Sequence, residues 1–126
     1  MSKAILSILL AVVSSSAVAE WAVVVNNDEF VGYVDSASIS RSDKVVRVSS
    51  LIDYKTAKAE AGKNYVSVKA QHEFNCAEGQ VRKLYLSEYS GKMGNGELVN
   101  YSYKIGNFEQ IQPYSILSAL RIFACG

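Results

Sequence analysis

Alternating apolar and polar positions run through most of the chain and predict β-strands. The clearest alternation lies at residues 65–76, where Val66, Val68, Ala70, His72, Phe74 and Cys76 share one face. The residues between them, such as Ser67, Lys69 and Glu73, are polar and share the other face. Residues 44–54 alternate in the same way. Strands with one apolar and one polar side are typical of an antiparallel sheet that exposes one face to water.

Turn residues divide the rest of the chain into further short strands. We expect a hairpin of residues 20–26 and 30–35, and then strands at 80–89 and 97–104. The Ser90–Gly96 stretch (SGKMGNG) between the last two ends in Asn-Gly, a strong hairpin signal. Residues 35–38 are expected to form a turn or one short helical turn, with Asp35 as its cap. Residues 55–62 have helical propensity but no apolar stripe, which indicates an exposed loop or a frayed turn.

The hydrophobic period changes near the end of the chain. Ile116, Leu117, Leu120, Phe123 and Ala124 fall on one helical face, and Ser115 precedes them as a plausible N-cap. A helix this short needs a surface on which to pack, and the apolar side of the sheet provides one. The pattern therefore predicts an α+β fold, a single antiparallel sheet of about six strands with a C-terminal helix on its apolar face.

The first nineteen residues have the pattern of a secretory signal peptide. Lys3 precedes an apolar run at residues 4–13, and Ala17-Val18-Ala19 is a small-x-small cleavage pattern. The run is too short to span a bilayer. The expected cleavage point also lacks the cysteine to which a lipid anchor would be attached. We expect residues 1–19 to be removed and residues 20–126 to form one domain in the periplasm, outside the cell or on its surface.

Cys76 and Cys125 are the two cysteines of the chain. In an exported protein an even number of cysteines favours a disulfide, and two permit only one intramolecular pairing. The bond would tie the helix end to a strand end and close a loop that stabilises the fold by about 4 kcal/mol in the chain-entropy model. One histidine and two cysteines do not make a zinc site. We therefore expect no metal and no cofactor.

After loss of Lys3, twelve basic residues balance twelve acidic ones. A net charge near zero argues against nucleic acid or an anionic membrane as a partner, and no later segment is long and apolar enough to span a membrane.

Several blocks of the chain resemble the surface-adhesin protein E-like domain family. The 65–76 segment, YVSVKAQHEFNC, is similar to the family's Y-x-S-x-K…C block. Tyr89 with the glycine-rich SGKMGNG stretch resembles the next block, and Gln112-Pro113-Tyr114-Ser115, a short helix and Cys125 resemble the last. Trp21 and the Tyr33-Val34-Asp35 turn also fit, so the likeness spans nearly all of the chain after the leader.

The resemblance implies a single antiparallel sheet whose concave face holds the C-terminal helix, tethered by the Cys76–Cys125 disulfide. It also implies an envelope protein of a Gram-negative bacterium and, in some members, an adhesin that binds host extracellular-matrix and serum proteins.

His72 is the only histidine of the chain, and it lies on the apolar face of its strand. It could act as a base or ligand in a pocket under the helix, or be a partly buried histidine hydrogen-bonded to a neighbour. No catalytic partner can be placed beside it, and no serine lies in a G-x-S-x-G sequence. We expect no catalytic site.

Tyrosines flanking the glycine-rich stretch are the better candidate for binding. Tyr85 and Tyr89 share a face of one strand, Tyr101 and Tyr103 share a face of the next, and Lys92 adds positive charge between them. Exposed tyrosines suit protein binding, whereas cross-strand aromatic packing would explain them without a partner.

Two functions follow from these residues. The leading hypothesis is a non-catalytic envelope module that binds a host or envelope protein through an exposed sheet edge or the glycine-rich hairpin. The alternative is a periplasmic protein that binds a small or peptide-like ligand between sheet and helix. An unpaired edge strand would also let two copies pair as a dimer.

Overall fold

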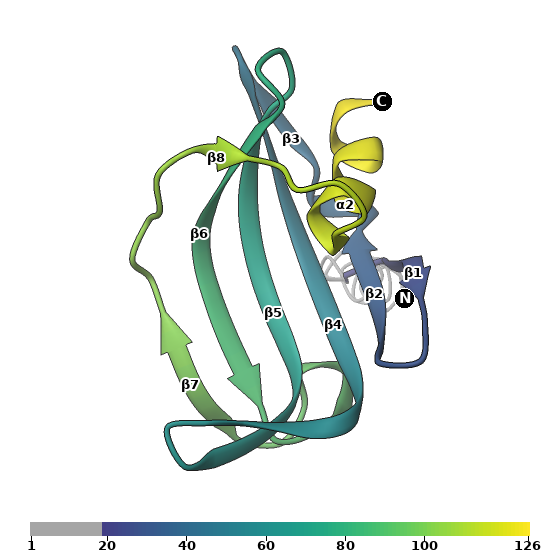
Figure 1. Ribbon diagram of the computed structural model, residues 1–126, viewed down its shortest axis with the longest axis vertical. Coiled ribbons are helices and arrows are strands. Elements are labelled where there is room, and N and C mark those ends of the chain that lie inside the picture. Colours follow the sequence, from purple (N-terminus) through teal and green to yellow (C-terminus); the bar gives the residue numbers. More distant parts are fainter. Residues whose placement is uncertain (1–18) are drawn as a thin grey trace, which may run out of the picture.

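The computed structural model describes residues 19–126, so the expected signal peptide lies almost entirely outside the described residues. An antiparallel sheet accounts for most of the described chain (Figure 1). Its path runs β1 (Trp21–Asn26), β2 (Phe30–Asp35), β4 (Val45–Glu60), β5 (Lys63–Asn75), β6 (Gln80–Tyr89) and β7 (Leu98–Ser102). β3 (Ser40–Ser42) pairs with β4, and β8 (Glu109–Gln110) pairs with β6. The six-strand path confirms the expected sheet, and β3 and β8 are two short additions.

Register shifts bend the sheet into a deep curve. One shift lies between Asp53 and Lys58 of β4, and another between Gln71 and His72 of β5. Extra residues in one strand of a pair bend that strand and increase its twist, and Figure 1 shows β4, β5 and β6 curving together. β1 and β7 remain the two ends of the path, so the sheet is not closed.

The helix α2 (Ile116–Cys125) lies on the concave side and contacts β1, β2, β4 and β5. The Ser115 hydroxyl caps it by accepting a hydrogen bond from the Ser118 amide at 3.2 Å, as expected. Gly32 of β2 lets the helix approach closely, because a Cβ there would lie 2.8 Å from the Ile116 Cδ1 atom. Leu120 and Ala124 point into the core beneath the helix.

The core lies between the concave face and α2. Its buried members are Val34, Val46, Val48, Phe74, Val81, Leu120 and Ala124. The Cys76–Cys125 disulfide closes this layer, with the two Cα atoms 5.6 Å apart, and confirms the expected pairing. The expected α+β fold, with its helix tethered to the concave face, is therefore observed.

Three local predictions were wrong. Residues 55–60 continue β4 as a strand, because Ala61 and Gly62 both adopt positive φ and form a two-residue turn into β5. The strand expected at 97–104 spans only Leu98–Ser102. Phe123, assigned to the buried helix face, is 41% exposed. Only Leu120 and Ala124 of the helix are fully buried in the core.

Of the two alternatives expected after Asp35, the structure shows the short helical turn, η1 (Ser36–Ser38), and the Asp35 carboxylate accepts from the Ala37 amide at 3.1 Å. In the described part of the chain, no helix has the length and hydropathy needed to cross a membrane.

Candidate functional site

A cavity of about 260 Å³ lies on the concave side, between the sheet and the first turns of α2. Most of its wall is apolar and comes from β4, β5, β6 and the helix: Ile52, Val68, Ala70, Leu86, Ile116, Leu117 and Leu120. Ser50, Tyr54, Tyr65, His72 and Glu88 complete the lining. The cavity therefore combines an apolar middle with a few polar groups, which is the usual composition of a small-molecule site.

Two of these polar side chains have buried atoms without a hydrogen-bond partner. They are His72 Nδ1 and Glu88 Oε1, and no other buried side-chain atom is left unpaired in residues 19–126. Glu88 pairs with Val68 across β5 and β6, whereas His72 lies four residues further along β5. At the rise of a β-strand, four residues span about 13 Å. The two unpaired groups therefore lie at different ends of the cavity.

His72 is neutral at physiological pH. Burial lowers its pKa from 6.5 to about 4, and the neighbouring Lys83 ammonium adds to this effect. Its ring lies 6.4 Å from that of Phe74, centroid to centroid. The sequence left open a hydrogen-bonded histidine or a histidine in a pocket. The structure places His72 in the lining of the cavity. Its Nδ1 atom has no hydrogen-bond partner among the described residues.

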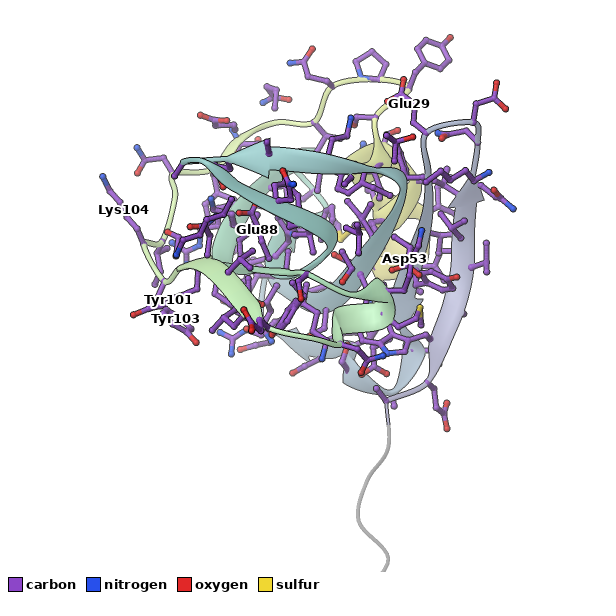
Figure 2. The ribbon with its side chains drawn as sticks, turned by 90° about the horizontal axis from the view of Figure 1, so that it is seen from below. Glu29, Asp53, Glu88, Tyr101, Tyr103 and Lys104 are labelled. Atoms are coloured by element: carbon purple, nitrogen blue, oxygen red, sulfur yellow. A yellow bond between two sulfur atoms is a disulfide. The ribbon has the colours of Figure 1, made fainter. Side chains whose placement is uncertain are left out.

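Glu88 was not singled out by the sequence pattern. Its side chain lies inside the curve of the sheet (Figure 2), and the residue is only 4% exposed. Burial and the nearby Glu60 carboxylate raise the pKa of Glu88, while the neighbouring Asn100 and Tyr65 act in the opposite direction. A carboxyl group that is buried next to another carboxylate, with one oxygen unpaired, is costly to the fold.

The convex face has its own buried carboxylate, Glu73 of β5. Its Oε2 atom accepts from Arg47 at 2.9 Å, and the Arg82 guanidinium contacts Oε1 at 2.7 Å. Burial alone would raise the pKa of Glu73, but the hydrogen bonds from Arg47 and Arg82 outweigh it, so the pKa is lowered. Glu73 is therefore fully paired where Glu88 is not.

The glycine-rich segment is held against the convex face by side chains of the sheet. The Asp53 carboxylate accepts from the Met93 amide at 2.7 Å, and Ser67 Oγ accepts from the Gly94 amide at 2.9 Å. Both amides belong to η2 (Lys92–Gly94), in which Met93 has a φ of 58°. The Lys92 ammonium donates to the Tyr54 carbonyl at 2.6 Å. This segment is thus anchored, and Lys92 is engaged within the protein.

The candidate tyrosines separate into a cluster and an outlier. Tyr85 stacks on Tyr103 with ring centroids 5.9 Å apart, and Tyr101 lies 5.5 Å from Tyr103. Tyr101 and Tyr103 are 63% and 69% exposed, and Figure 2 shows both projecting outward from the curved sheet. Tyr89 instead accepts from the Ser87 hydroxyl at 3.1 Å, beneath the Lys69 ammonium. We call Tyr85, Tyr101 and Tyr103 the tyrosine surface.

Residues 19–126 contain no cluster of three or more histidine, cysteine or acidic side chains that would suit a metal ion. Two features of the described residues are notable: an interior cavity with two unpaired polar groups, and an exterior tyrosine surface at the β7 edge.

The family model described as surface-adhesin protein E matches residues 21–126 of the chain. Among solved structures, one of Haemophilus influenzae protein E is 18% identical and covers 87% of this chain and 86% of its own, with a TM-score of 0.61. A second crystal form of that protein is 17% identical and covers 86% of this chain and 96% of its own, with a TM-score of 0.58. At such identity these structures show a shared fold. No curated protein showed a significant match.

Proposed function

Because the chain belongs to the surface-adhesin protein E family, we propose that it is an exported, non-catalytic module that binds a host or envelope protein through its tyrosine surface. The observation that carries this proposal is the exposure of Tyr101 and Tyr103 at a sheet end. Large aromatic side chains that already stack on one another bind with little loss of conformational freedom.

The edge of the sheet supports the same location. β7 is the last strand of the path, so its outer backbone groups have no neighbouring strand. An exposed edge can accept an extended segment of a partner, while side chains beside it provide specificity. Lys104 follows Tyr103 on the exposed rim (Figure 2) and adds a positive charge. A partner with an extended, acidic segment fits these features best.

The absence of an acid–base pair at His72 supports a binding role over catalysis. Its Nδ1 atom has no partner among the described residues, whereas a general base needs to be oriented by a second group and to reach a substrate proton. With a pKa of about 4, this histidine would also transfer protons poorly at neutral pH.

The decisive test replaces the two exposed rings. Tyr101→Ser/Tyr103→Ser should weaken binding to immobilised extracellular-matrix and serum proteins by about tenfold or more, as expected when aromatic anchors are lost. Surface plasmon resonance would measure the affinities. Tyr114→Ser is the matched control, because Tyr114 is fully exposed and lies outside the tyrosine surface. Unchanged affinity of the double variant for every bound protein would place the interface elsewhere.

Export through the first nineteen residues is part of the proposal, and its test is independent of any ligand. Protease and antibody access to the protein is compared on intact and on permeabilised cells. Access on intact cells would support display at the surface. Protection until permeabilisation would confine the protein to the periplasm and remove host proteins from the set of partners.

A second function, binding of a small ligand between sheet and helix, is supported by a separate observation. The concave cavity holds the two buried polar atoms without partners. Its volume of about 260 Å³ falls just below the usual range of roughly 300–1,000 Å³ for ligand pockets, which suits a small molecule better than a peptide.

A further inference from the structure

We propose that the concave cavity binds an elongated amine, with its ammonium group on Glu88, its apolar body along Val68 and Ala70, and an oxygen-bearing far end at His72. This inference rests on the small-ligand function proposed above and is independent of the tyrosine surface. Three features of the cavity determine the ligand class: its carboxylate end, its apolar middle and its imidazole end.

At the carboxylate end, one oxygen of Glu88 has no donor and can receive a cation. Glu88 Oε1 is buried without a hydrogen bond, so an N–H group that reached it would recover the cost of removing that oxygen from water. The rings of Tyr54 and Tyr65 form the adjoining wall. The Lys58 ammonium already lies 5.2 Å from the centre of the Tyr54 ring, so the ligand ammonium is placed on the Glu88 carboxylate and not on that ring.

Negative charge at this end is reinforced by Glu60. Its carboxylate is close enough to raise the pKa of Glu88, and both residues line a depression with Asn100 and Lys83 on the β7 side. The Lys83 charge acts on the pKa of His72 and is not among the causes that shift the pKa of Glu88. An ammonium group between two carboxylates relieves their repulsion, whereas a ligand carboxylate would increase it. The end occupied by Glu88 therefore selects for a cation.

The middle of the cavity sets the shape of the ligand. Val68, Ala70 and Leu86 form its floor, and Leu117 and Leu120 of α2 cover it. These side chains offer no polar partner, so the part of the ligand between the two ends must be apolar. The distance of about 13 Å along β5 between the ends matches an extended chain better than a compact ring.

The far end is polar and carries positive charge nearby. His72 Nδ1 is buried and unpaired, and Lys83 is close enough to lower the pKa of His72. A second ammonium group there would be repelled by Lys83. A ligand hydroxyl can instead form a hydrogen bond with His72 Nδ1, and its oxygen is not repelled by the Lys83 ammonium. A hydroxyl at the far end therefore suits the site.

A larger depression of about 590 Å³ beside the disulfide is a weaker candidate. Arg121, the charged residue of its lining, already donates to the Cys76 carbonyl at 3.3 Å.

The first experiment compares three probes with the same tail by isothermal titration calorimetry on the chain from residue 20 to 126. We expect octylamine to bind about tenfold or more tightly than octanoate and octanol, because only octylamine pairs with a buried carboxylate. Glu88→Gln should remove this preference. Glu78→Gln is the matched control, since Glu78 is exposed in the turn between β5 and β6, and it should leave all three affinities unchanged.

The outcomes separate the two proposals. Equal binding of the three probes, or an unchanged preference for octylamine in Glu88→Gln, would overturn the amine and leave small-ligand binding standing. Failure of all three probes to bind would overturn both. Ala70→Leu fills the apolar floor and keeps the Glu88 carboxyl group, so it should abolish octylamine binding, and retained affinity in this variant would place the amine outside the cavity. Far-UV circular dichroism would confirm that each variant is folded.

The second experiment tests the imidazole end with ω-aminooctanol, which adds a hydroxyl to the far end of octylamine. One added hydrogen bond in a buried site should strengthen binding about fivefold to tenfold. His72→Leu should abolish this gain while leaving octylamine affinity within about twofold of the original, since octylamine has no group for the imidazole. A gain that persists in His72→Leu would overturn the assignment of the far end.

Discussion

Glu73 and Glu88 are almost equally buried, at 5% and 4% exposure, yet the fold treats them in opposite ways. Glu73 lies between Arg47 and Arg82 on the convex face, with contacts of 2.9 and 2.7 Å. Glu88 on the concave face has an unpaired oxygen and a carboxylate neighbour, and its pKa is raised instead of lowered. Glu73 therefore stabilises the sheet through its ion pairs, whereas burial of Glu88 lowers the stability of the folded chain.

The same contrast extends to the residues around each glutamate. On the convex face, Asp53 and Ser67 are buried and satisfied by the backbone of η2. On the concave face, His72 shares with Glu88 the lack of a partner and lies in the same cavity. Unpaired buried groups are rare in native proteins, and their gathering in one cavity is the strongest structural argument that the concave face binds something.

Removing the disulfide should produce the largest effect on stability, and its local consequence should appear on the concave side of this comparison. Cys76→Ala/Cys125→Ala opens a loop defined by a separation of 49 residues, so we expect a loss of about 4 kcal/mol in the free energy of unfolding. Urea denaturation would measure it. As the helix loosens, the pKa of His72 should rise from about 4 toward its ordinary value, which NMR would detect.

The oxidised protein provides the matching control, because it should contain no free thiol. Titration of two thiols in the folded, exported protein would contradict the pairing. An unchanged His72 pKa in the double variant would show that α2 keeps its position without the disulfide.

The second largest effect is expected from acid, which should lower the free energy of unfolding by protonating His72 on the concave side. Its pKa is about 4 in the folded chain and 6.5 as the ordinary value, so the unfolded chain binds a proton first as the pH falls. Stability is therefore complete above pH 6.5 and is lost between pH 6.5 and 4, by up to about 3 kcal/mol. Urea denaturation of the wild type and His72→Gln across this range would measure the difference.

Glu73 and Glu88 titrate in both of those proteins, so their contributions cancel in the comparison. If His72→Gln loses as much stability as the wild type over the same range, His72 is not held neutral by burial.

Local periodicity was enough to predict much of the fold and half of the cavity. The alternation in 65–76 placed His72, Phe74 and Cys76 on the helix-facing side, as observed. The Ser115 cap was predicted from residue type and short-range spacing. The disulfide joins residues 49 positions apart, and it was predicted because two cysteines permit only one intramolecular pairing. Such features require no knowledge of how distant segments meet.

The features that were missed depend on contacts between distant segments or on unusual backbone geometry. Glu88 lies on the concave face beside a register shift at Glu88/Tyr89, and its neighbour Glu60 is brought close by the curve of β4. The bond from Asp53 to Met93 joins residues forty positions apart. The turn at Ala61 was missed because alanine rarely adopts positive φ. A sequence pattern carries no signal for such contacts.

Replacing each glutamate with leucine tests the central comparison directly, and the two variants should differ in sign. Glu73→Leu should destabilise the protein by about 2 kcal/mol, less than the roughly 3–5 kcal/mol of a fully buried pair, because water can reach both arginines. Their side chains are 50% and 34% exposed. Glu88→Leu should stabilise it by about 1 kcal/mol, since a carboxyl group with one unpaired oxygen is removed from an apolar wall. Urea denaturation at pH 7 would measure both.

The gain in Glu88→Leu should also depend on pH in a defined direction. Because the pKa of Glu88 is raised in the folded chain, protonation favours folding, and this contribution is present below the ordinary pKa of 4.5 and lost as the pH rises through the folded value. The advantage of Glu88→Leu should therefore be largest at pH 7 to 8 and shrink toward pH 4. A destabilised Glu88→Leu would mean that Glu88 is as well satisfied as Glu73. The concave cavity would then have no unmet carboxylate to offer a cationic ligand.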